Sequence, residues 1–129
     1  MQIHHVGYLT KNLKKTQAQM EQLGYTVERA AAYDAGRDVN IAFLVSGGYR
    51  IELVEPTGKE SPLYPLLKRY KNTPYHICYQ VADLDAALEE LEAKGYSVIQ
   101  PPREAPCIDG RKVAFLMQIN MGMIELLEN

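Results

Sequence analysis

Apolar residues along the chain follow two spacings, one typical of strands and the other of helices. Runs rich in β-branched and aromatic residues span residues 3–9 and 75–81. After each run, apolar residues recur at steps of three and four, from Leu13 to Leu23 and from Leu84 to Leu91. This spacing predicts two amphipathic helices. Their expected caps are Asn12 and Asp83 at the N-termini and Gly24 and Gly95 just beyond the C-termini.

Three strand-like runs follow each helix. They span residues 25–29, 39–45 and 49–55 after the first helix, and 96–100, 112–117 and 123–127 after the second. Hairpin turns are expected at Ser46-Gly47-Gly48 and at Asn120-Met121-Gly122. Each half of the chain therefore predicts a β-α-β-β-β module. The modules cover about 1–56 and 74–129, and the linker, about 57–73, contains a short helix over 62–70.

The two halves are related by an internal repeat. His5-Val6-Gly7-Tyr8 matches His76-Ile77-Cys78-Tyr79 at an offset of 71 residues. Ala42-Phe43-Leu44 matches Ala114-Phe115-Leu116 at 72, and Ile51-Glu52-Leu53 matches Ile124-Glu125-Leu126 at 73. The offset between matching motifs grows by two residues along the chain, and the extra residues fall in loops, where insertions are tolerated. A duplicated module within one domain of 129 residues is the strongest signal in the sequence.

Four polar residues of the repeat share one side of the predicted strands. Side chains alternate between the two faces of a sheet, and the apolar neighbours of these residues suit the face covered by the helix. The other face of the sheet receives the side chains of His5, Glu52, His76 and Glu125. If the halves meet edge to edge about a pseudo-twofold axis, the four side chains converge inside a cupped, mixed sheet. We therefore predict an α+β fold built around a metal site.

A simpler interpretation exists for each of these residues taken alone. A strand histidine is more often a hydrogen-bonded or exposed residue, and a glutamate between two aliphatic residues usually faces solvent. The repetition favours the metal site, because both halves place His and Glu in the same structural slot. Two imidazoles and two carboxylates suit a divalent ion such as Ni, Zn, Co, Mn or Fe.

Composition and charge exclude several other classes of protein. The net charge of −2 gives no reason to expect nucleic acid or an anionic membrane as a partner, and no apolar run approaches the length of a membrane span. The N-terminus has no signal-peptide pattern. Cys78 and Cys107 form neither a disulfide framework nor a CxxC pair, so both are interpreted as packing thiols in a cytoplasmic protein.

The chain resembles the vicinal oxygen chelate superfamily over essentially its whole length. The motifs that carry the resemblance are His5-Val6-Gly7, Ile51-Glu52-Leu53-Val54-Glu55-Pro56, Ser61-Pro62-Leu63, residues 75–81, Lys112-Val113-Ala114-Phe115-Leu116 and residues 122–126. The likeness is to the glyoxalase I and methylmalonyl-CoA epimerase branch, and it implies that His5, Glu52, His76 and Glu125 bind the metal. This ligand set is the pattern of bacterial glyoxalase I, whereas residues 62–67 and 105–112 look more like the epimerases. The resemblance also implies a homodimer.

Such a site favours proton abstraction beside a metal-bound oxygen. A substrate with two neighbouring oxygens would chelate the metal, and the charge of the resulting enediolate would lie on it. Glu52 and Glu125 are the candidates to remove and return the proton. The ligand set favours a glyoxalase I of the lactoylglutathione lyase type, which acts on a hemithioacetal with glutathione or another thiol as co-substrate. The alternatives are a methylmalonyl-CoA epimerase, which acts on a thioester, a drug- or metabolite-binding protein without catalysis, and a dioxygenase.

Other polar residues give weaker signals. His4 aligns with Tyr75 and is interpreted as structural. The side chain of Arg50 is expected on the same face of its strand as that of Glu52. Among the cations it is the best candidate to anchor a substrate, because a guanidinium pairs well with carboxylates. The basic run of Lys68, Arg69 and Lys71 is interpreted as a solvated face, with a contact to a CoA phosphate as the minority view.

Overall fold

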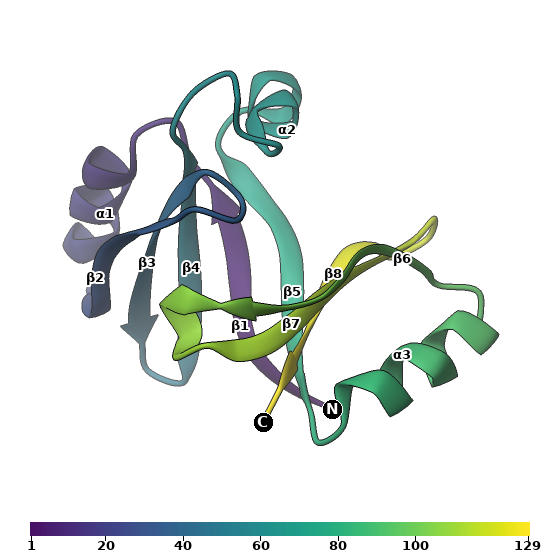
Figure 1. Ribbon diagram of the computed structural model, residues 1–129. Helices are drawn as coiled ribbons and strands as arrows, with labels where there is room; N and C mark the ends of the chain where they lie inside the picture. Colours follow the sequence, from purple (N-terminus) through teal and green to yellow (C-terminus); the bar gives the residue numbers. More distant parts are fainter. The chain divides into compact units, whose positions relative to one another are not determined.

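The computed structural model describes all 129 residues and contains eight strands, three α-helices and one short 3₁₀ helix. Figure 1 shows these elements coloured along the chain. The first half holds β1 (Gln2–Leu9), α1 (Leu13–Gln22), β2 (Thr26–Asp34), β3 (Val39–Ser46) and β4 (Tyr49–Pro56), followed by α2 (Tyr64–Tyr70). The second half holds β5 (Thr73–Val81), α3 (Leu84–Ala93), β6 (Ser97–Ala105), the 3₁₀ helix η1 (Pro106–Ile108), β7 (Arg111–Gln118) and β8 (Gly122–Glu128). The predicted pair of β-α-β-β-β modules is confirmed.

The fold divides into two compact units, and strand β1 contributes to both. The N-terminal unit covers Val6–Tyr75, and the C-terminal unit joins Met1–His5 to His76–Asn129. The strands are hydrogen-bonded in the order β2-β3-β4-β1-β5-β8-β7-β6. β1 pairs with β4 and β5 with β8 in parallel, whereas the other pairs within each unit are antiparallel hairpins. The sheet is therefore mixed, and the α+β fold class is confirmed.

The repeat is visible in local details of both units. The side chains of Asn12 and Asp83 cap α1 and α3 by accepting a backbone N–H three residues further on, each at 3.0 Å. Gly24 and Gly95 follow the helices with φ of 96° and 97°, a region that favours glycine because other residues clash through Cβ. The hairpins β2–β3 and β6–β7 both contain two shifts of register.

A second contact ties the start of each helix to the last strand of its module. The first helical N–H of α1, at Leu13, donates to Glu55 Oε2 at 2.7 Å. The corresponding N–H of α3, at Leu84, donates to Glu128 Oε2 at 2.9 Å. A carboxylate suits this position because the first N–H groups of a helix lack intrahelical acceptors and carry partial positive charge. These contacts hold each helix on its own sheet.

The observed elements are longer than predicted in the outer strands. β2 continues to Asp34 and β6 to Ala105, several residues beyond the expected ends at 29 and 100. β6 tolerates Pro101 and Pro102 because it is an edge strand, where a missing N–H leaves no ladder bond unmade. The linker helix α2 is shorter than expected and begins at Tyr64.

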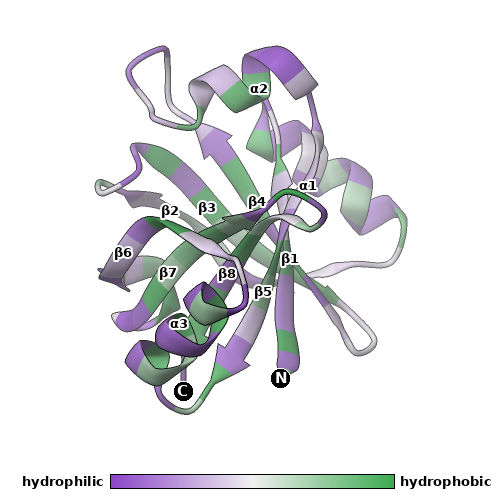
Figure 2. Ribbon diagram, turned by 90° about the vertical axis from the view of Figure 1, so that its right-hand side faces the viewer, coloured by the Kyte–Doolittle hydropathy of each residue, from purple (hydrophilic) through white to green (hydrophobic).

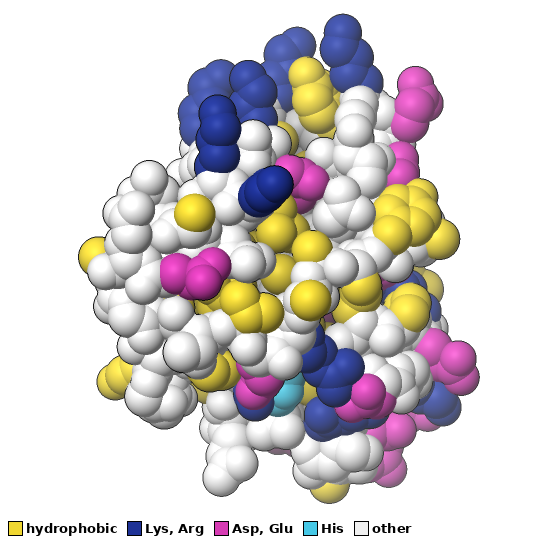
Figure 3. Space-filling view, turned by 90° about the vertical axis from the view of Figure 1, so that its left-hand side faces the viewer, with side chains coloured by type: hydrophobic (Ala, Val, Ile, Leu, Met, Phe, Trp, Pro, Cys, Tyr) yellow, Lys and Arg dark blue, Asp and Glu magenta, His cyan; other side chains and the backbone are white.

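Lys and Arg side chains gather at the top of Figure 3, the level at which Figure 1 draws α2.

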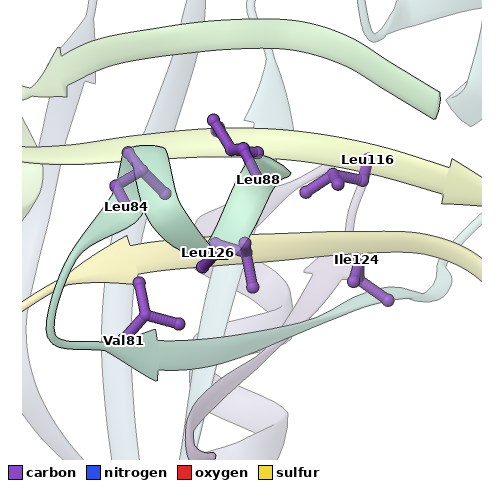
Figure 4. Packing of buried hydrophobic residues seen from close by; sticks show 8 residues of the cluster. Val81, Leu84, Leu88, Leu116, Ile124 and Leu126 are labelled. Carbon is purple, nitrogen blue, oxygen red and sulfur yellow. The ribbon is translucent and has the colours of Figure 1, made fainter. Parts of the chain in front are cut away.

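Each helix covers one face of its own strands with an apolar core. In the C-terminal unit, α3 packs over β6, β7 and β8, and Figure 4 shows residues of the resulting core cluster. Its buried members are Val81, Leu84, Ala87, Leu88, Ala114, Leu116, Ile124 and Leu126. α1 covers β3 and β4 in the same way, with Leu13, Ala42, Leu44 and Leu53 buried. Figure 2 shows hydrophobic and hydrophilic positions interleaved along α3. The helix-covered face is thus the predicted apolar face.

Candidate metal centre

The four candidate metal ligands lie on strands, at positions that alternate with the core residues packed under the helices. His5 lies on β1, His76 on β5, Glu52 on β4 and Glu125 on β8. His76 is 4% exposed, and the other three are fully buried. The interpretation of the glutamates as solvent-facing members of amphipathic strands is therefore wrong. A buried carboxylate is costly unless other groups or an ion compensate its charge.

Three of these residues meet within the C-terminal unit. The Nε2 atoms of His5 and His76 are 3.2 Å apart. Oε1 of Glu125 is 3.1 Å from His5 Nε2 and 3.8 Å from His76 Nε2. The structure thus brings two imidazole nitrogens and one carboxylate oxygen to a single point.

These distances fit the coordination shell of a divalent metal. For a metal–ligand distance of about 2.1 Å, neighbouring ligand atoms lie about 3.0 Å apart in an octahedron and about 3.4 Å apart in a tetrahedron. The observed separations of 3.1, 3.2 and 3.8 Å fall close to this range. Imidazole with carboxylate is also a donor set that transition-metal ions accept. The residues present therefore fit a divalent metal.

Glu52 occupies the equivalent position in the N-terminal unit. Its register partner on β3 is Phe43, just as Glu125 is paired across the ladder with Phe115 of β7. Its register partner on β1 is Gly7, and the matching partner of Glu125 on β5 is Cys78. The backbone environment of the two glutamates is thus repeated. A shared role for Glu52 in the same metal site remains a prediction.

His4 contributes a contact that its strand parity did not predict. Its Nδ1 lies 2.8 Å from Nδ1 of His5, and the two rings meet edge to face with centroids 5.1 Å apart. When His5 offers the lone pair of Nε2 to a metal, its Nδ1 carries the proton and donates to His4. A metal-binding histidine commonly donates its second ring N–H in this way, which orients the ring. His4 is thus placed to orient His5.

Other groups complete the surroundings of the two histidines. The ring of Phe115 packs edge to face against His76 with centroids 5.2 Å apart, an apolar contact on the buried side. Cys78 Sγ, with His4 and His5, forms a group of donor atoms within 4.8 Å of one another. This group shares His5 with the donor set formed by His76 and Glu125.

The basic residues considered as substrate anchors lie elsewhere. Arg50 binds Glu28 of β2 through two contacts, from Nε to Oε1 at 2.8 Å and from Nη2 to Oε2 at 3.0 Å. The fork of its guanidinium is therefore engaged with a carboxylate of its own unit. Cys78, which is buried, and Cys107 form no disulfide. No helix of the chain is long and apolar enough to cross a membrane.

Comparison with known proteins finds relatives that match nearly the whole chain. The ethylmalonyl-CoA/methylmalonyl-CoA epimerase of Cereibacter sphaeroides is 28% identical over 127 residues, 96% of this chain and 95% of that protein. The structure of a Streptomyces coelicolor methylmalonyl-CoA epimerase variant with 2-nitronate-propionyl-CoA aligns with a TM-score of 0.85 and 24% identity, covering 100% of this chain and 94% of that one. A methylmalonyl-CoA epimerase in complex with methylmalonyl-CoA and NH4+ aligns with a TM-score of 0.82 and 25% identity, covering 98% and 93% of the two chains.

A family model adds the assignment at the level of the superfamily. The model described as Glyoxalase/Bleomycin resistance protein/Dioxygenase superfamily matches residues 4–115, which is most of the chain and includes parts of both modules. The expected resemblance to the superfamily is therefore confirmed, and the relatives described above are methylmalonyl-CoA epimerases. The chain belongs to the glyoxalase/bleomycin resistance protein/dioxygenase superfamily.

Proposed function

We propose that this protein is a metal-dependent epimerase of a methylmalonyl-type CoA thioester. The observation that carries the proposal is the buried meeting of His5, His76 and Glu125 with donor atoms 3.1–3.8 Å apart. Relatives that span nearly the whole chain and are methylmalonyl-CoA epimerases support the choice of substrate. The ion would be held by these three residues and by Glu52, and Ni, Zn, Co or Mn would satisfy the donor set.

The reaction needs only a proton to leave and return. A bound divalent metal would supply Lewis-acid polarisation of neighbouring substrate oxygens. The acidic C–H lies between the carboxylate and the thioester carbonyl of the substrate. One carboxylate of the pair Glu52 and Glu125 takes this proton as the C–H electron pair moves into the adjacent carbonyl. The other carboxyl group, in its acid form, returns a proton to the opposite face of the same carbon, and exchange with water restores both groups.

The residues around the donor set support this chemistry. His4 holds the ring of His5, because the 2.8 Å contact between their Nδ1 atoms fixes which nitrogen stays available. The ring of Phe115 packs edge to face against His76 and gives the imidazole an apolar neighbour. A dry site strengthens the attraction between a developing negative charge and nearby positive charge.

A glyoxalase I reaction is the second candidate, and the ligand set favours it. The combination of His5, Glu52, His76 and Glu125 matches the bacterial glyoxalase I pattern. In that reaction the proton moves between the adjacent carbons of a hemithioacetal formed with glutathione or another thiol. Both reactions use the same first step, so the substrate assay discriminates between them.

The test combines metal loading with two substrates. Protein stripped with a chelator is loaded in turn with Ni, Co, Mn and Zn, and its metal content is measured. Epimerisation of methylmalonyl-CoA is followed in D2O, where the returning proton is replaced by deuterium. Conversion of the methylglyoxal–glutathione adduct is measured in parallel. We expect epimerisation with deuterium incorporation, whereas conversion of the adduct alone would transfer the assignment to glyoxalase I.

Two matched variants identify the residues. Glu125→Gln removes the carboxylate from the donor set while keeping its shape, and Glu92→Gln makes the same change on the exposed surface of α3. We expect Glu125→Gln to lose most turnover, and Glu92→Gln to keep it. Full turnover with Glu125→Gln, at an unchanged metal content, would refute the role given to this carboxylate.

A further inference from the structure

A pocket of about 200 Å³ lies in the N-terminal unit beside α2. Its walls are Lys11, from the loop after β1, and five residues of α2 and the segment that follows: Tyr64, Leu67, Lys68, Lys71 and Asn72. We call this group the lysine pocket. Three of its six residues are cations and none is acidic. This composition is unusual for a chain whose net charge is −2, so the pocket is a local concentration of positive charge.

The three lysines have no acidic partner within the protein. Other cations of the N-terminal unit are paired, as Arg37 is with Asp34 and Arg50 with Glu28. None of the pocket lysines forms an ion pair, and the neighbouring Arg69 lies over the ring of Tyr70, with its guanidinium carbon 5.3 Å from the ring centre. Like charges such as lysine ammonium groups repel one another at short range. An anion in the pocket would convert this repulsion into attraction.

The backbone at Lys71 has a conformation that a lysine rarely adopts. Its φ is 62° and its ψ is −158°, a region that is populated almost only by glycine. The residue ends α2, and its N–H donates to the carbonyl of Leu67 at 2.9 Å. Glycine would relieve the strain there, yet the chain has a lysine whose side chain lines the pocket. A strained residue at a pocket wall is a recurring feature of ligand sites.

Asn72 fixes the two sides of the pocket to each other. Its Oδ1 accepts the backbone N–H of Lys11 at 3.0 Å, and its Nδ2 donates to Thr10 Oγ1 at 3.4 Å. The loop that carries Lys11 is therefore tied to the end of α2, which carries Lys68 and Lys71. Prior ordering of this kind lowers the entropy lost when a ligand binds. The walls also offer the half-buried ring of Tyr64 and the buried Leu67 as apolar surface.

We propose that the lysine pocket binds the phosphate-bearing end of the CoA carrier. The identity of the carrier rests on the proposed function, whereas the preference for phosphate rests on the pocket itself. Several clustered ammonium groups suit a multiply charged phosphate ester, because each is a point charge that donates in several directions. The apolar wall of Tyr64 and Leu67 suits the nucleoside that carries those phosphates. The basic run at residues 68–71, interpreted from the sequence as a solvated face, then has a binding role.

The test measures binding of adenosine 3′,5′-bisphosphate, CoA and inorganic phosphate to the full-length protein by calorimetry. The binding variant is Lys11→Gln/Lys68→Gln/Lys71→Gln. The matched control is Lys14→Gln/Lys15→Gln/Lys59→Gln, which makes the same change of net charge at exposed lysines outside the pocket. We expect the binding variant to lose roughly tenfold affinity per lysine, as each charge-assisted contact is removed. The control should keep the affinity of the wild type.

A third variant separates ligand binding from folding. Lys71→Gly removes the side chain and the backbone strain together, so we expect a higher melting temperature and weaker binding of adenosine 3′,5′-bisphosphate. Equal loss of affinity in the binding variant and the control would overturn the proposal, since general electrostatics would then explain it. Binding of inorganic phosphate as tight as that of CoA would also overturn it, because the pocket would then hold a free anion rather than the carrier.

The outcome also separates this proposal from the proposed function. If the protein epimerises methylmalonyl-CoA and the binding variant has an unchanged KM, the pocket proposal fails and the epimerase assignment stands. If no epimerisation occurs but adenosine 3′,5′-bisphosphate binds and the binding variant abolishes this binding, the pocket stands and the reaction is different. If both the epimerase assignment and the pocket proposal hold, we expect the binding variant to have a higher KM for the CoA thioester with little change in kcat. The lost contacts would bind the substrate and the transition state equally, and such contacts affect KM alone.

Discussion

His4 and His5, neighbours on one strand, meet through their Nδ1 atoms at 2.8 Å. The opposite nitrogen of His5, Nε2, faces Glu125 Oε1 at 3.1 Å. One imidazole therefore links a half-buried histidine to the buried donor set. The contact assigns tautomers, since only one of two facing nitrogens can carry the shared proton. If His5 binds a metal through Nε2, His4 must offer an unprotonated Nδ1.

This relationship predicts a graded effect of replacing His4. We expect His4→Leu to weaken metal affinity roughly 10–100-fold, the range seen when a hydrogen-bond partner of a metal ligand is removed. His4→Asn should recover part of this loss, because its amide oxygen can accept the N–H of His5. Competition with a coloured chelator measures both constants. Equal affinities for the Leu and Asn variants would show that hydrogen bonding by His4 does not matter.

The donor set predicts that metal stabilises the folded protein. A ligand that binds only the native state adds RT ln(1 + [L]/Kd), which is about 4 kcal/mol at a thousandfold excess over Kd. We expect the melting temperature of the stripped protein to rise on addition of Zn or Ni, and to fall again with a chelator. His76→Ala should abolish the response. A response of wild-type size in His76→Ala would place the metal elsewhere.

The contacts from Glu55 and Glu128 predict equivalent losses of stability in the two modules. Each carboxylate accepts the first helical N–H of its module, at Leu13 and at Leu84. We expect Glu55→Ala and Glu128→Ala each to lower the free energy of unfolding by roughly 0.5–2 kcal/mol, as measured by urea denaturation. The control Glu92→Gln on the exposed surface should stay within about 0.5 kcal/mol. Loss in only one module would contradict an energetic equivalence of the repeats.

Asp38 predicts a pH-dependent contribution to stability. Hydrogen bonds from Thr57 Oγ1 and Tyr33 OH to its carboxylate, both at 2.7 Å, hold its pKa below the ordinary value of 3.8. A lowered folded-state pKa stabilises the protein above 3.8, and this contribution is lost as the pH falls through the folded-state pKa. We expect Asp38→Asn to be less stable than wild type at pH 7, with the difference shrinking as the pH falls below 3.8 and vanishing once it has passed the lower folded-state pKa. Asn is the suitable replacement, because it tolerates the positive φ of 52° at this position.

Much of the fold could be predicted because it depends on local patterns that occur twice. Helix spacing with Asn12 and Asp83 as caps located α1 and α3 closely, since a cap and an apolar stripe are properties of a short segment. The ends of β2 and β6 could not be predicted, because pairing with the neighbouring strand extends them past the apolar run. The role of Glu55 and Glu128 had a signal that was missed: they are separated by 73 residues, the same offset as Glu52 and Glu125.

The residue pattern alone predicts a doubled β-α-β-β-β module with His and Glu on the face away from each helix. Alternation along a strand is enough for that, because every second side chain shares a face. The folded structure was needed to learn that Glu125 is fully buried, that it lies within 3.8 Å of both histidines, and that His4 contacts His5. These facts depend on strands far apart in the chain packing against one another. Parity gives the face of a side chain, whereas distance and burial come from the packing of the whole unit.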